Sequence, residues 1–322
     1  MRAVRMARTG SPEVLELEEV AEPTPGDHEV VVEVAAAGVN FIDTYQRSGA
    51  YPLPLPTGLG LEGAGTVVAV GREVTSRQVG DPVAWAEALG SYAEQVTVRA
   101  DRTVRVPPDL DPPRAAALML QGMTAHYLAN STYALRRDDV ALVYAAAGGV
   151  GRLLVQLAKR RGARVLACTS TEEKAAQVRK LGADAVIRYR DVDVVDAVRE
   201  LTDGQGVDVV YDSVGADTFE SSLDALKPRG LLVLFGQASG PVPPLDLQEL
   251  NRRGSLYVTR PSLGAYTATL DELEWRAGAL FDLVRSGQLD VHVHAAYPLA
   301  EAARAHTDLT SGTTSGKLLL TP

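Results

Sequence analysis

A glycine-rich stretch, VYAAAGGVG at residues 143–151, is the clearest pattern for binding chemistry in this 322-residue chain. Compared with the pattern G-x-G-x-x-G, it has Ala146, Gly148 and Gly151 at the three glycine positions. The second glycine lets a pyrophosphate approach the backbone and the third lets a helix pack on a strand, while alanine can sometimes form the first turn. Alone, such a glycine cluster is as typical of close helix packing as of a cofactor site. Because a predicted strand precedes it and a predicted helix follows it, we interpret it as a dinucleotide site.

The residues at the end of the next predicted strand bear on which dinucleotide binds. An acidic residue there would accept from the ribose 2′-hydroxyl of NAD and would repel a 2′-phosphate. This chain instead has CTST at 168–171, with Lys174 one helical turn later. Hydroxyls and an ammonium favour NADPH, although a solvated helix face is the alternative for Lys174. We interpret Ser170-x-x-Glu173 as a capping box, in which Glu172 and Glu173 stabilise a first helical turn rather than bind a ribose.

The elements that must position these residues follow an alternating rhythm from about residue 123. Hydrophobic, Val/Leu-rich runs alternate with amphipathic stretches, which predicts a doubly wound parallel sheet covered on both faces. The predicted strands are 140–145, 164–170, 183–189, 207–215 and 231–236. SLYVTRP at 255–261 would supply one more strand, for which we consider the sheet edge.

The beginning and the end of the chain have a different texture. Residues 1–122 contain short strands separated by turn signals, which is typical of an antiparallel barrel or sandwich. A helix near 271–287 and short strands near the C-terminus follow the alternating region, and we assign residues 265–322 to the same domain as 1–122. We expect the middle domain to comprise residues 123–264.

Composition excludes several classes of protein. Hydrophobic residues make up 46% and charged residues 23%, which is ordinary for a globular chain. The net charge of −9, without a basic run, argues against nucleic-acid binding. No signal-peptide pattern or long apolar run is present, so we expect no membrane association and a cytoplasmic protein. Cys168 is the only cysteine and lies in an apolar run, which predicts an inert core thiol.

Several motifs together carry a resemblance to a known family. Asp138-Asp139, the AAAGGVG run with Gln156 and Lys159, and the segments 40–56, 209–215 and 255–263 resemble the quinone oxidoreductase and zeta-crystallin family. This family is a zinc-free branch of the medium-chain dehydrogenase/reductase superfamily. The resemblance implies a GroES-like β-barrel catalytic domain plus a Rossmann domain, with NADPH in the cleft between them.

The resemblance also indicates that no zinc is bound. The zinc-binding members carry a Cys ligand in a G-[IV]-C element and a His ligand in a G-H-E-x-x-G element. Asn40 and Leu61 stand at these positions here, and neither is a suitable zinc ligand. His292 and His294 more often mark a wet surface than a metal site. Without a Lewis acid the acceptor must already be electron-poor, as quinones and α,β-unsaturated carbonyls are.

The resemblance implies that Asn40, Asp43 and Tyr45, with Tyr51 nearby, face the nicotinamide and the substrate. Asn40 could hydrogen-bond the acceptor oxygen or the nicotinamide ribose. Tyr45 or Tyr51 could stack on a flat ring or donate a proton, with packing in a Pro-rich loop as the alternative. A turn-forming hydrogen bond is the alternative for Asp43, and no acid–base pair is visible.

On the cofactor side, the resemblance implies contacts from several loops. Those residues are Thr124, Gly148, Gly149, Val150, Gly151, Ser170, Lys174, Tyr189, Ser213, Phe235, Gly236, Gln237 and Arg260, with Asn40 shared between cofactor and substrate. Gly312 stands where some members carry an Arg that reaches the phosphate. Lys317 is a possible substitute, but we interpret it as a surface lysine.

We therefore expect an NADPH-dependent quinone reductase. An NADPH-dependent enoyl or alkenal double-bond reductase is the alternative, and a non-catalytic, crystallin-like NADPH-binding protein is a third, weaker hypothesis. We also expect a homodimer paired edge to edge through SLYVTRP, because a bare apolar edge strand invites pairing.

Overall fold

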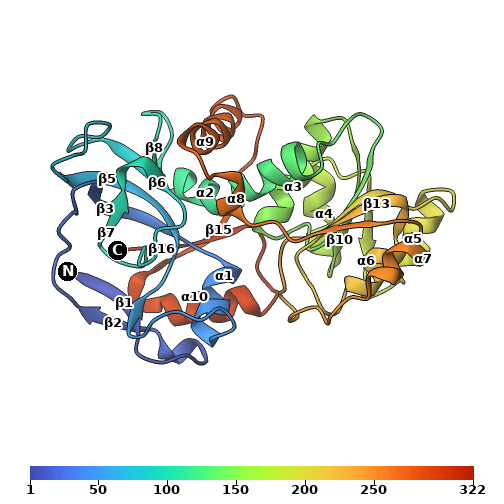
Figure 1. The fold of residues 1–322 in the computed structure, drawn as a ribbon, viewed down its shortest axis with the longest axis horizontal. Helices are drawn as coiled ribbons and strands as arrows, with labels where there is room; N and C mark the ends of the chain where they lie inside the picture. Colours follow the sequence, from blue (N-terminus) through green and yellow to red (C-terminus); the bar gives the residue numbers. More distant parts are fainter. The chain divides into compact units, whose positions relative to one another are not determined.

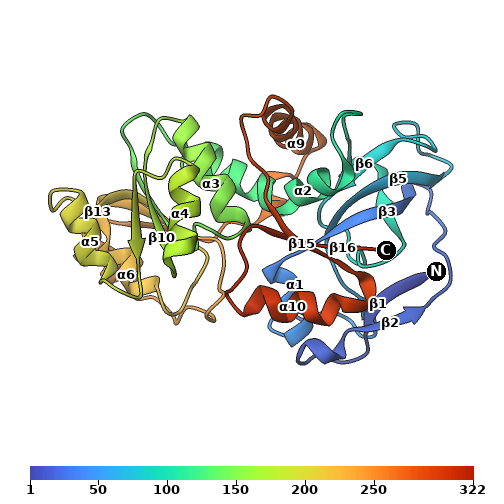
Figure 2. The same ribbon diagram turned by 180° about the vertical axis from the view of Figure 1, so that it is seen from behind.

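The computed structural model describes residues 1–322 and divides into two compact units. The split unit comprises Met1–Met123 and Thr267–Pro322, and the central unit comprises Thr124–Tyr266. Figure 1 shows each unit with its own sheet, and Figure 2 shows both from behind. The two units are described separately below.

The split unit is built on a seven-stranded sheet of order β15-β16-β3-β5-β6-β8, with β7 paired to β3. Its pairs are antiparallel except for β15 and β16. The strands are β3 (Glu29–Val39), β5 (Glu62–Val70), β6 (Pro82–Trp85), β7 (Gln95–Arg99), β8 (Thr103–Arg105), β15 (Val293–Pro298) and β16 (Lys317–Thr321). A smaller sheet holds β2 (Glu16–Glu19), β1 (Arg2–Met6) and β4 (Thr57–Gly58).

Strand β3 is the central strand of this unit because it pairs with three others, β16, β5 and β7. Its valines favour a pleated, half-buried surface. Val30, Val32, Val34 and Val39 all enter the core of the split unit, which also contains Trp85. The end of β3 is thereby held rigidly, and helix α1 (Phe41–Ser48) begins directly after it.

The remaining helices of the split unit are α9 (Leu270–Arg285), α10 (Ala302–Thr310) and the short turns η1 (Pro12–Val14), η2 (Ala100–Arg102) and η4 (Leu299–Glu301). The division between the units falls within α2 (Pro112–Tyr127). No helix of the structure combines the length and the apolar character needed to cross a membrane.

The central unit contains a six-stranded sheet in which every pair is parallel. Its order is β11-β10-β9-β12-β13-β14, so the chain reverses direction across the sheet between β9 and β12. The strands are β9 (Val140–Val143), β10 (Arg164–Thr169), β11 (Ala185–Arg188), β12 (Val207–Asp212), β13 (Leu226–Leu234) and β14 (Tyr257–Thr259). The predicted doubly wound sheet is confirmed, as is the edge position of SLYVTRP.

Helices cover both faces of this sheet, with α3 and α4 on one face and α5 and α6 on the other (Figures 1 and 2). They are α3 (Gly149–Arg160), α4 (Glu172–Lys180), α5 (Val194–Leu201), α6 (Phe219–Asp224), α7 (Leu247–Arg252), α8 (Leu263–Tyr266) and η3 (Leu128–Thr132). Strand β12 is buried along its whole length, as expected for a strand covered on both faces.

Candidate active site

The carboxyl edge of the central sheet brings together most residues predicted to bind a cofactor. Parallel strands end at the same edge, where ligands of open α/β sheets bind. Five of the six strands are followed directly by a residue that we predicted to bind the cofactor. After β9, the predicted residue Gly148 comes at the end of a short turn. In sheet order from β11 these residues are Tyr189, Ser170, Gly148, Ser213, Phe235 and Arg260.

The glycine-rich turn after β9 is tight. The amide of Gly148 donates to the carbonyl of Ala145 at 2.8 Å, and Ala145 has φ +46°. The left-handed residue is thus Ala145, one position before the Ala146 that we predicted for the first turn. A Cβ on Gly151 would lie 2.7 Å from Ala146 Cα and would also collide with the Ala145 carbonyl oxygen. Gly151 is therefore required where α3 packs against the turn.

The amino end of α3 has the features of an anion site. Its N-cap is Gly148, which offers no side chain to the first amides of the helix. The first amides of any helix lack intrahelical acceptors, and the helix dipole adds partial positive charge there. Gly149, Val150 and Gly151 supply these amides. A pyrophosphate fits this cradle.

The cap of α4 corrects one prediction. Thr171, not Ser170, is the N-cap, and its Oγ1 accepts from the amide of Lys174 at 3.3 Å. The predicted capping box from Ser170 to Glu173 is wrong by one residue. Glu172 forms ion pairs with Arg179 and Arg188, so its charge is already balanced by the protein.

A second cation lies beside Lys174. Burial, and next the nearby charge of Arg190, lowers the pKa of Lys174. Two cations in this position repel each other, and an anion with more than one negative charge would relieve that repulsion. The sequence reasoning missed Arg190, although its place directly after Tyr189 at the end of a predicted strand was an available signal. The hydroxyl of Thr169 is buried at the end of the neighbouring strand β10, directly before Ser170.

The other half of the edge is also closely packed. A Cβ on Gly236 would lie 2.8 Å from Ser213 Cα, so the loops after β12 and β13 touch there. Arg260 donates from Nη1 to the Leu234 carbonyl at 2.9 Å and from Nη2 to Gln237 Oε1 at 3.4 Å. Ser213, Gly236, Gln237 and Arg260 therefore form one cluster. Thr124 lies apart from this edge in sequence, buried in α2.

In the split unit, Asn40 is the N-cap of α1 and its side chain is buried, with 2% exposed. Its Oδ1 accepts from Gln121 Nε2 at 3.0 Å and from Lys317 Nζ at 2.9 Å. Its Nδ2 donates to Glu62 Oε1 at 2.6 Å. Both ends of the amide are thus engaged inside the protein. The sequence reasoning missed Gln121 and Glu62 as partners of Asn40.

Lys317 is not the surface lysine that we predicted. It is 2% exposed and forms a buried ion pair with Glu62, which is fully buried. The second oxygen of Glu62 accepts from the backbone amide of Leu120 at 2.6 Å. A Cβ on Gly38 would lie 2.6 Å from Glu62 Cδ, so a glycine at position 38 makes room for this carboxylate.

Asp43 belongs to a second buried chain of side chains. Its Oδ2 accepts from the Asn40 amide at 2.8 Å and from the Tyr92 hydroxyl at 2.7 Å. Burial raises the pKa of Asp43 to about 7, and the hydrogen bonds from Tyr92 and Asn40 oppose this rise only in part. The turn-forming bond that we considered for Asp43 is present, and Tyr92 is an additional partner.

The chain continues from Tyr92 to α10. The Tyr92 oxygen lies 3.2 Å from His306 Nε2, and His306 Nδ1 lies 3.1 Å from Arg47 Nη1. A guanidinium only donates, so Nδ1 accepts and the neutral ring carries its proton on Nε2. Burial, and next the charge of Arg47, lowers the pKa of His306 to about 3. The sequence reasoning missed these three residues because nothing in their spacing connects them.

Aromatic side chains gather on and after α1. The rings of Tyr45 and Tyr51 meet edge to face with centroids 5.3 Å apart, and Phe41 lies 6.4 Å from Tyr45. The amide of Tyr51 donates to the Tyr45 carbonyl at 3.0 Å. Both tyrosines are half-buried and Phe41 is exposed. The structure thus brings together Tyr45, on the helix that Asn40 caps, and Tyr51, which follows that helix.

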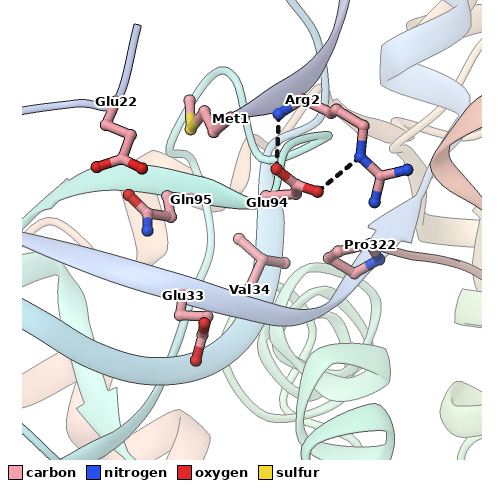
Figure 3. A pocket seen from close by; sticks show the side chains of 8 residues that line it. All are labelled: Met1, Arg2, Glu22, Glu33, Val34, Glu94, Gln95 and Pro322. Atoms are coloured by element: carbon pink, nitrogen blue, oxygen red, sulfur yellow. Dashed lines mark hydrogen bonds and ion pairs between the residues drawn. The ribbon is translucent and has the colours of Figure 1, made fainter. Parts of the chain in front are cut away.

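A separate surface hollow of about 400 Å³ contains none of the predicted residues. Figure 3 shows Arg2 reaching Glu94 across it, with Glu22 and Glu33 on its walls. The side chain of Arg2 donates from Nε to Glu94 at 2.7 Å. Its acidic walls suit neither the phosphates of a dinucleotide nor a neutral ring, so this hollow is not the candidate site.

The histidines and the cysteine form no further site. His292 and His294 are exposed with ring centroids 6.3 Å apart, and the structure contains no group of three or more His, Cys, Asp or Glu able to hold a metal. Cys168 is fully buried, and burial raises its pKa well above the usual range. It is the inert core thiol that the sequence predicts.

These features define a two-domain, nicotinamide-dependent oxidoreductase of the medium-chain dehydrogenase/reductase class. The family model described as "Alcohol dehydrogenase GroES-like domain" matches residues 26–108, and the model described as "Zinc-binding dehydrogenase" matches residues 149–275. The predicted GroES-like and Rossmann fold class is therefore confirmed. The residues around Asn40, Leu61 and Lys317 do not fit the zinc ion named in the second description.

Close relatives identify the family within this class. The quinone oxidoreductase of Pseudomonas aeruginosa is 48% identical, over 100% of this chain and 99% of the relative. A 2-haloacrylate reductase from a Burkholderia species is 42% identical, over 98% and 97%. The solved Escherichia coli quinone oxidoreductase, complexed with NADPH, superimposes with a TM-score of 0.98 at 45% identity, with 100% of both chains covered. The chain belongs to the quinone oxidoreductase family.

Proposed function

We propose that this protein is an NADPH-dependent quinone reductase. The observation that carries this proposal is the row of predicted residues along the carboxyl edge of the central sheet, with the charge of Arg190 near Lys174 in the first turns of α4. The relatives at 46–48% identity that bear the name quinone oxidoreductase support the same function. We also propose that residues 123–264 form the NADPH-binding domain and that 1–122 with 265–322 form the catalytic domain.

NADPH, when bound, supplies a hydride from its nicotinamide ring. The amides of Gly149, Val150 and Gly151 bind its pyrophosphate at the amino end of α3. Ser170, Lys174 and Arg190 hold the 2′-phosphate. The remaining contacts come from Thr124, Gly148, Tyr189, Ser213, Phe235, Gly236, Gln237 and Arg260. An ammonium and a guanidinium at the 2′-position provide charge-assisted contacts that NADH lacks.

The catalytic residues in this proposal are Asn40, Tyr45 and Tyr51. The edge-to-face pair of tyrosines offers an aromatic surface on which a flat quinone ring stacks. A quinone that accepts a hydride also takes up a proton, from a tyrosine hydroxyl or from solvent. Asn40 is engaged at both ends of its amide, so its part is to hold the start of α1 in place unless one of those bonds is released.

We further propose that the reaction needs no zinc. The positions of the two ligand elements hold Asn40 and Leu61, and the Lys317 ammonium lies against Asn40 and Glu62. A buried ammonium repels a divalent cation, and leucine offers no donor atom. Without a Lewis acid the protein depends on an acceptor that is already electron-poor.

Reduction of an activated alkene is the second candidate, and the 42% identity to a 2-haloacrylate reductase favours it. Steady-state values of kcat/KM with NADPH separate the two for 1,4-benzoquinone, 9,10-phenanthrenequinone, a 2-enal and 2-chloroacrylate. We expect the quinones to lead by at least about tenfold, which corresponds to a difference of about 1.4 kcal/mol in transition-state stabilisation. A lead of that size for an alkene would reverse the assignment. NADPH binding without turnover of any acceptor would favour the non-catalytic hypothesis.

We propose a homodimer that pairs through β14. This strand is the sheet edge, and Tyr257 on it is 61% exposed. A bare edge strand offers unpaired backbone groups to a second copy. Light scattering at micromolar concentration should give twice the chain mass of 34.2 kDa, and a Tyr257→Pro variant should give the monomer. A monomer for the unmodified protein would contradict the proposal.

A further inference from the structure

We propose that the Lys317 ammonium is a built-in cation that replaces a metal ion in the split unit and positions Asn40 for the reaction. The proposal rests on the proposed quinone reductase function. Lys317 contacts the two elements in which zinc-binding relatives of this class carry ligands, at Asn40 and at Glu62. It touches no reacting atom in this account, so it is a positioning residue.

The charge of Glu62 gives the first reason. Glu62 is fully buried, and an unpaired carboxylate in such a place costs several kcal/mol. Its Oε1 receives Asn40 Nδ2 and Lys317 Nζ, and its Oε2 receives the Leu120 amide. Among these donors only Lys317 carries a positive charge. The ammonium therefore supplies the compensation that a metal ion would otherwise supply.

The orientation of the Asn40 amide gives the second reason. Oδ1 accepts from two donors, Lys317 Nζ and Gln121 Nε2, while Nδ2 faces the Glu62 carboxylate. An ammonium never accepts a hydrogen bond, so a flipped amide would set Nδ2 against it and Oδ1 against a carboxylate. Lys317 and Glu62 together allow one orientation only.

Asn40 transmits this order to α1. Its backbone amide donates to Asp43 Oδ2, and its backbone carbonyl accepts from the Asp43 amide at 3.1 Å. Tyr45 follows five residues later on the same helix and forms the aromatic pair with Tyr51. Loss of the ammonium removes one of the two donors to Asn40 Oδ1 and the only positive charge beside Glu62. The Asn40 amide is then held less firmly at the start of the helix that carries Tyr45.

Chemical rescue tests the proposal. In Lys317→Ala we expect kcat with 9,10-phenanthrenequinone to fall by about 10- to 100-fold, which corresponds to the worth of a charge-assisted hydrogen bond, while the Kd of NADPH changes less than about twofold. Methylammonium or ethylammonium should restore kcat in a saturable manner. Tetramethylammonium at equal ionic strength should not, because it has no N–H donor.

Lys227→Ala is the matched control, because Lys227 also forms an ion pair, with Asp208, but is partly exposed in the central unit. Its kcat should stay at the level of the unmodified protein and should not respond to amines. The double variant Glu62→Gln/Lys317→Met removes both buried charges and keeps the protein folded even if Lys317→Ala does not fold. The double variant should have the melting temperature of the unmodified protein but not its kcat, because two neutral partners no longer fix the orientation of the Asn40 amide.

Three results would overturn the proposal. They are a folded Lys317→Ala variant with kcat within about twofold of the unmodified protein, a loss of kcat that no primary amine restores, and full activity in the double variant. An unmodified protein that fails to reduce any quinone would instead remove the proposed function. In that case a rise in the melting temperature of Lys317→Ala with methylammonium, and not with tetramethylammonium, still supports the built-in cation, and no such rise overturns it.

Discussion

His306 Nε2 lies 3.2 Å from the hydroxyl oxygen of Tyr92, and that hydroxyl donates to Asp43 at 2.7 Å. A histidine with its pKa lowered to about 3 and a carboxyl group with its pKa raised to about 7 are thus joined through one tyrosine. Burial is the main cause of both shifts, so in the folded state both groups are neutral between about pH 3 and pH 7. The two groups make opposite contributions to stability as the pH changes.

The pH dependence of unfolding follows from these directions. In the unfolded chain the pKa of an Asp side chain is about 3.9 and that of a His side chain is about 6.5. Between about pH 4 and 6.5 the folded state holds an extra proton on Asp43 and the unfolded state an extra proton on His306, so the two effects largely cancel. Above about pH 6.5 only Asp43 differs between the states, and we expect the stability to fall slightly until about pH 7.

Two variants separate the opposing effects. His306→Asn leaves Asp43, so stability should fall as the pH rises from about 4 to 7, by roughly 4 kcal/mol at most. Asp43→Asn leaves His306, so stability should rise with pH from about 4 to 6.5 by a similar amount. Urea unfolding midpoints across this range check both slopes. Curves parallel to that of the unmodified protein would show that neither group titrates as described.

Lys174 should discriminate between the two nicotinamide cofactors. A charge-assisted contact contributes about 1.5–3 kcal/mol, so Lys174→Ala should raise the Kd of NADPH by roughly 10- to 100-fold and leave that of NADH almost unchanged. Arg190→Ala should act in the same direction. Lys180, which is exposed at the end of the same helix, gives the control variant Lys180→Ala. Equal losses for NADPH and NADH would remove the 2′-phosphate from this position.

Two substitutions in the glycine-rich turn should have opposite effects, one stabilising the fold and the other disrupting the turn. Ala145 has a positive φ, so Ala145→Gly should relieve strain and stabilise the fold by about 1 kcal/mol. Gly151→Ala should collide with the turn and abolish NADPH binding. Gly278→Ala is the control, because outside the backbone of its own helix α9 nothing lies within 4 Å of the Cβ position. Thermal unfolding and NADPH titration check the three variants, and a Gly151→Ala protein with normal NADPH affinity would contradict the cradle.

The tyrosine pair should act through its rings. Tyr45→Phe keeps the aromatic surface and should hold KM for a quinone within about threefold, whereas Tyr45→Ala should raise it by about tenfold or more through lost stacking. Tyr51→Phe and Tyr51→Ala form a matched second pair. Steady-state kinetics give KM and kcat separately. A large fall of kcat in either Phe variant, with KM unchanged, would point to a tyrosine hydroxyl as the proton donor instead.

The sequence predicted the central unit well because its signals are local. Val/Leu-rich runs marked the buried parallel strands, and residues at or near the ends of those runs formed the row from Tyr189 to Arg260. The error at Ser170 was also local, since Thr171 beside it is an equally good cap. A pattern of hydroxyls cannot decide between two neighbours.

The buried network of the split unit could not be predicted from the sequence, because its partners lie far apart along the chain. Lys317 and Glu62 are 255 residues apart, and His306 and Tyr92 are 214 apart. Their partnership depends on β16 pairing with β3 and on α10 packing within the same unit, and neither can be inferred from the spacing of single charged residues. An isolated lysine near a chain end is normally exposed, so Lys317 was assigned to the surface.

NADPH-dependent reduction of a quinone can be followed in a single-turnover experiment. The protein is loaded with one equivalent of NADPH and mixed with excess 9,10-phenanthrenequinone, and NADPH loss and hydroquinone formation are followed together. We expect one hydroquinone for each NADPH consumed, formed at a rate at least about tenfold above that with NADH. No quinone-dependent loss of NADPH beyond the protein-free rate, or equal rates with NADH, would contradict it.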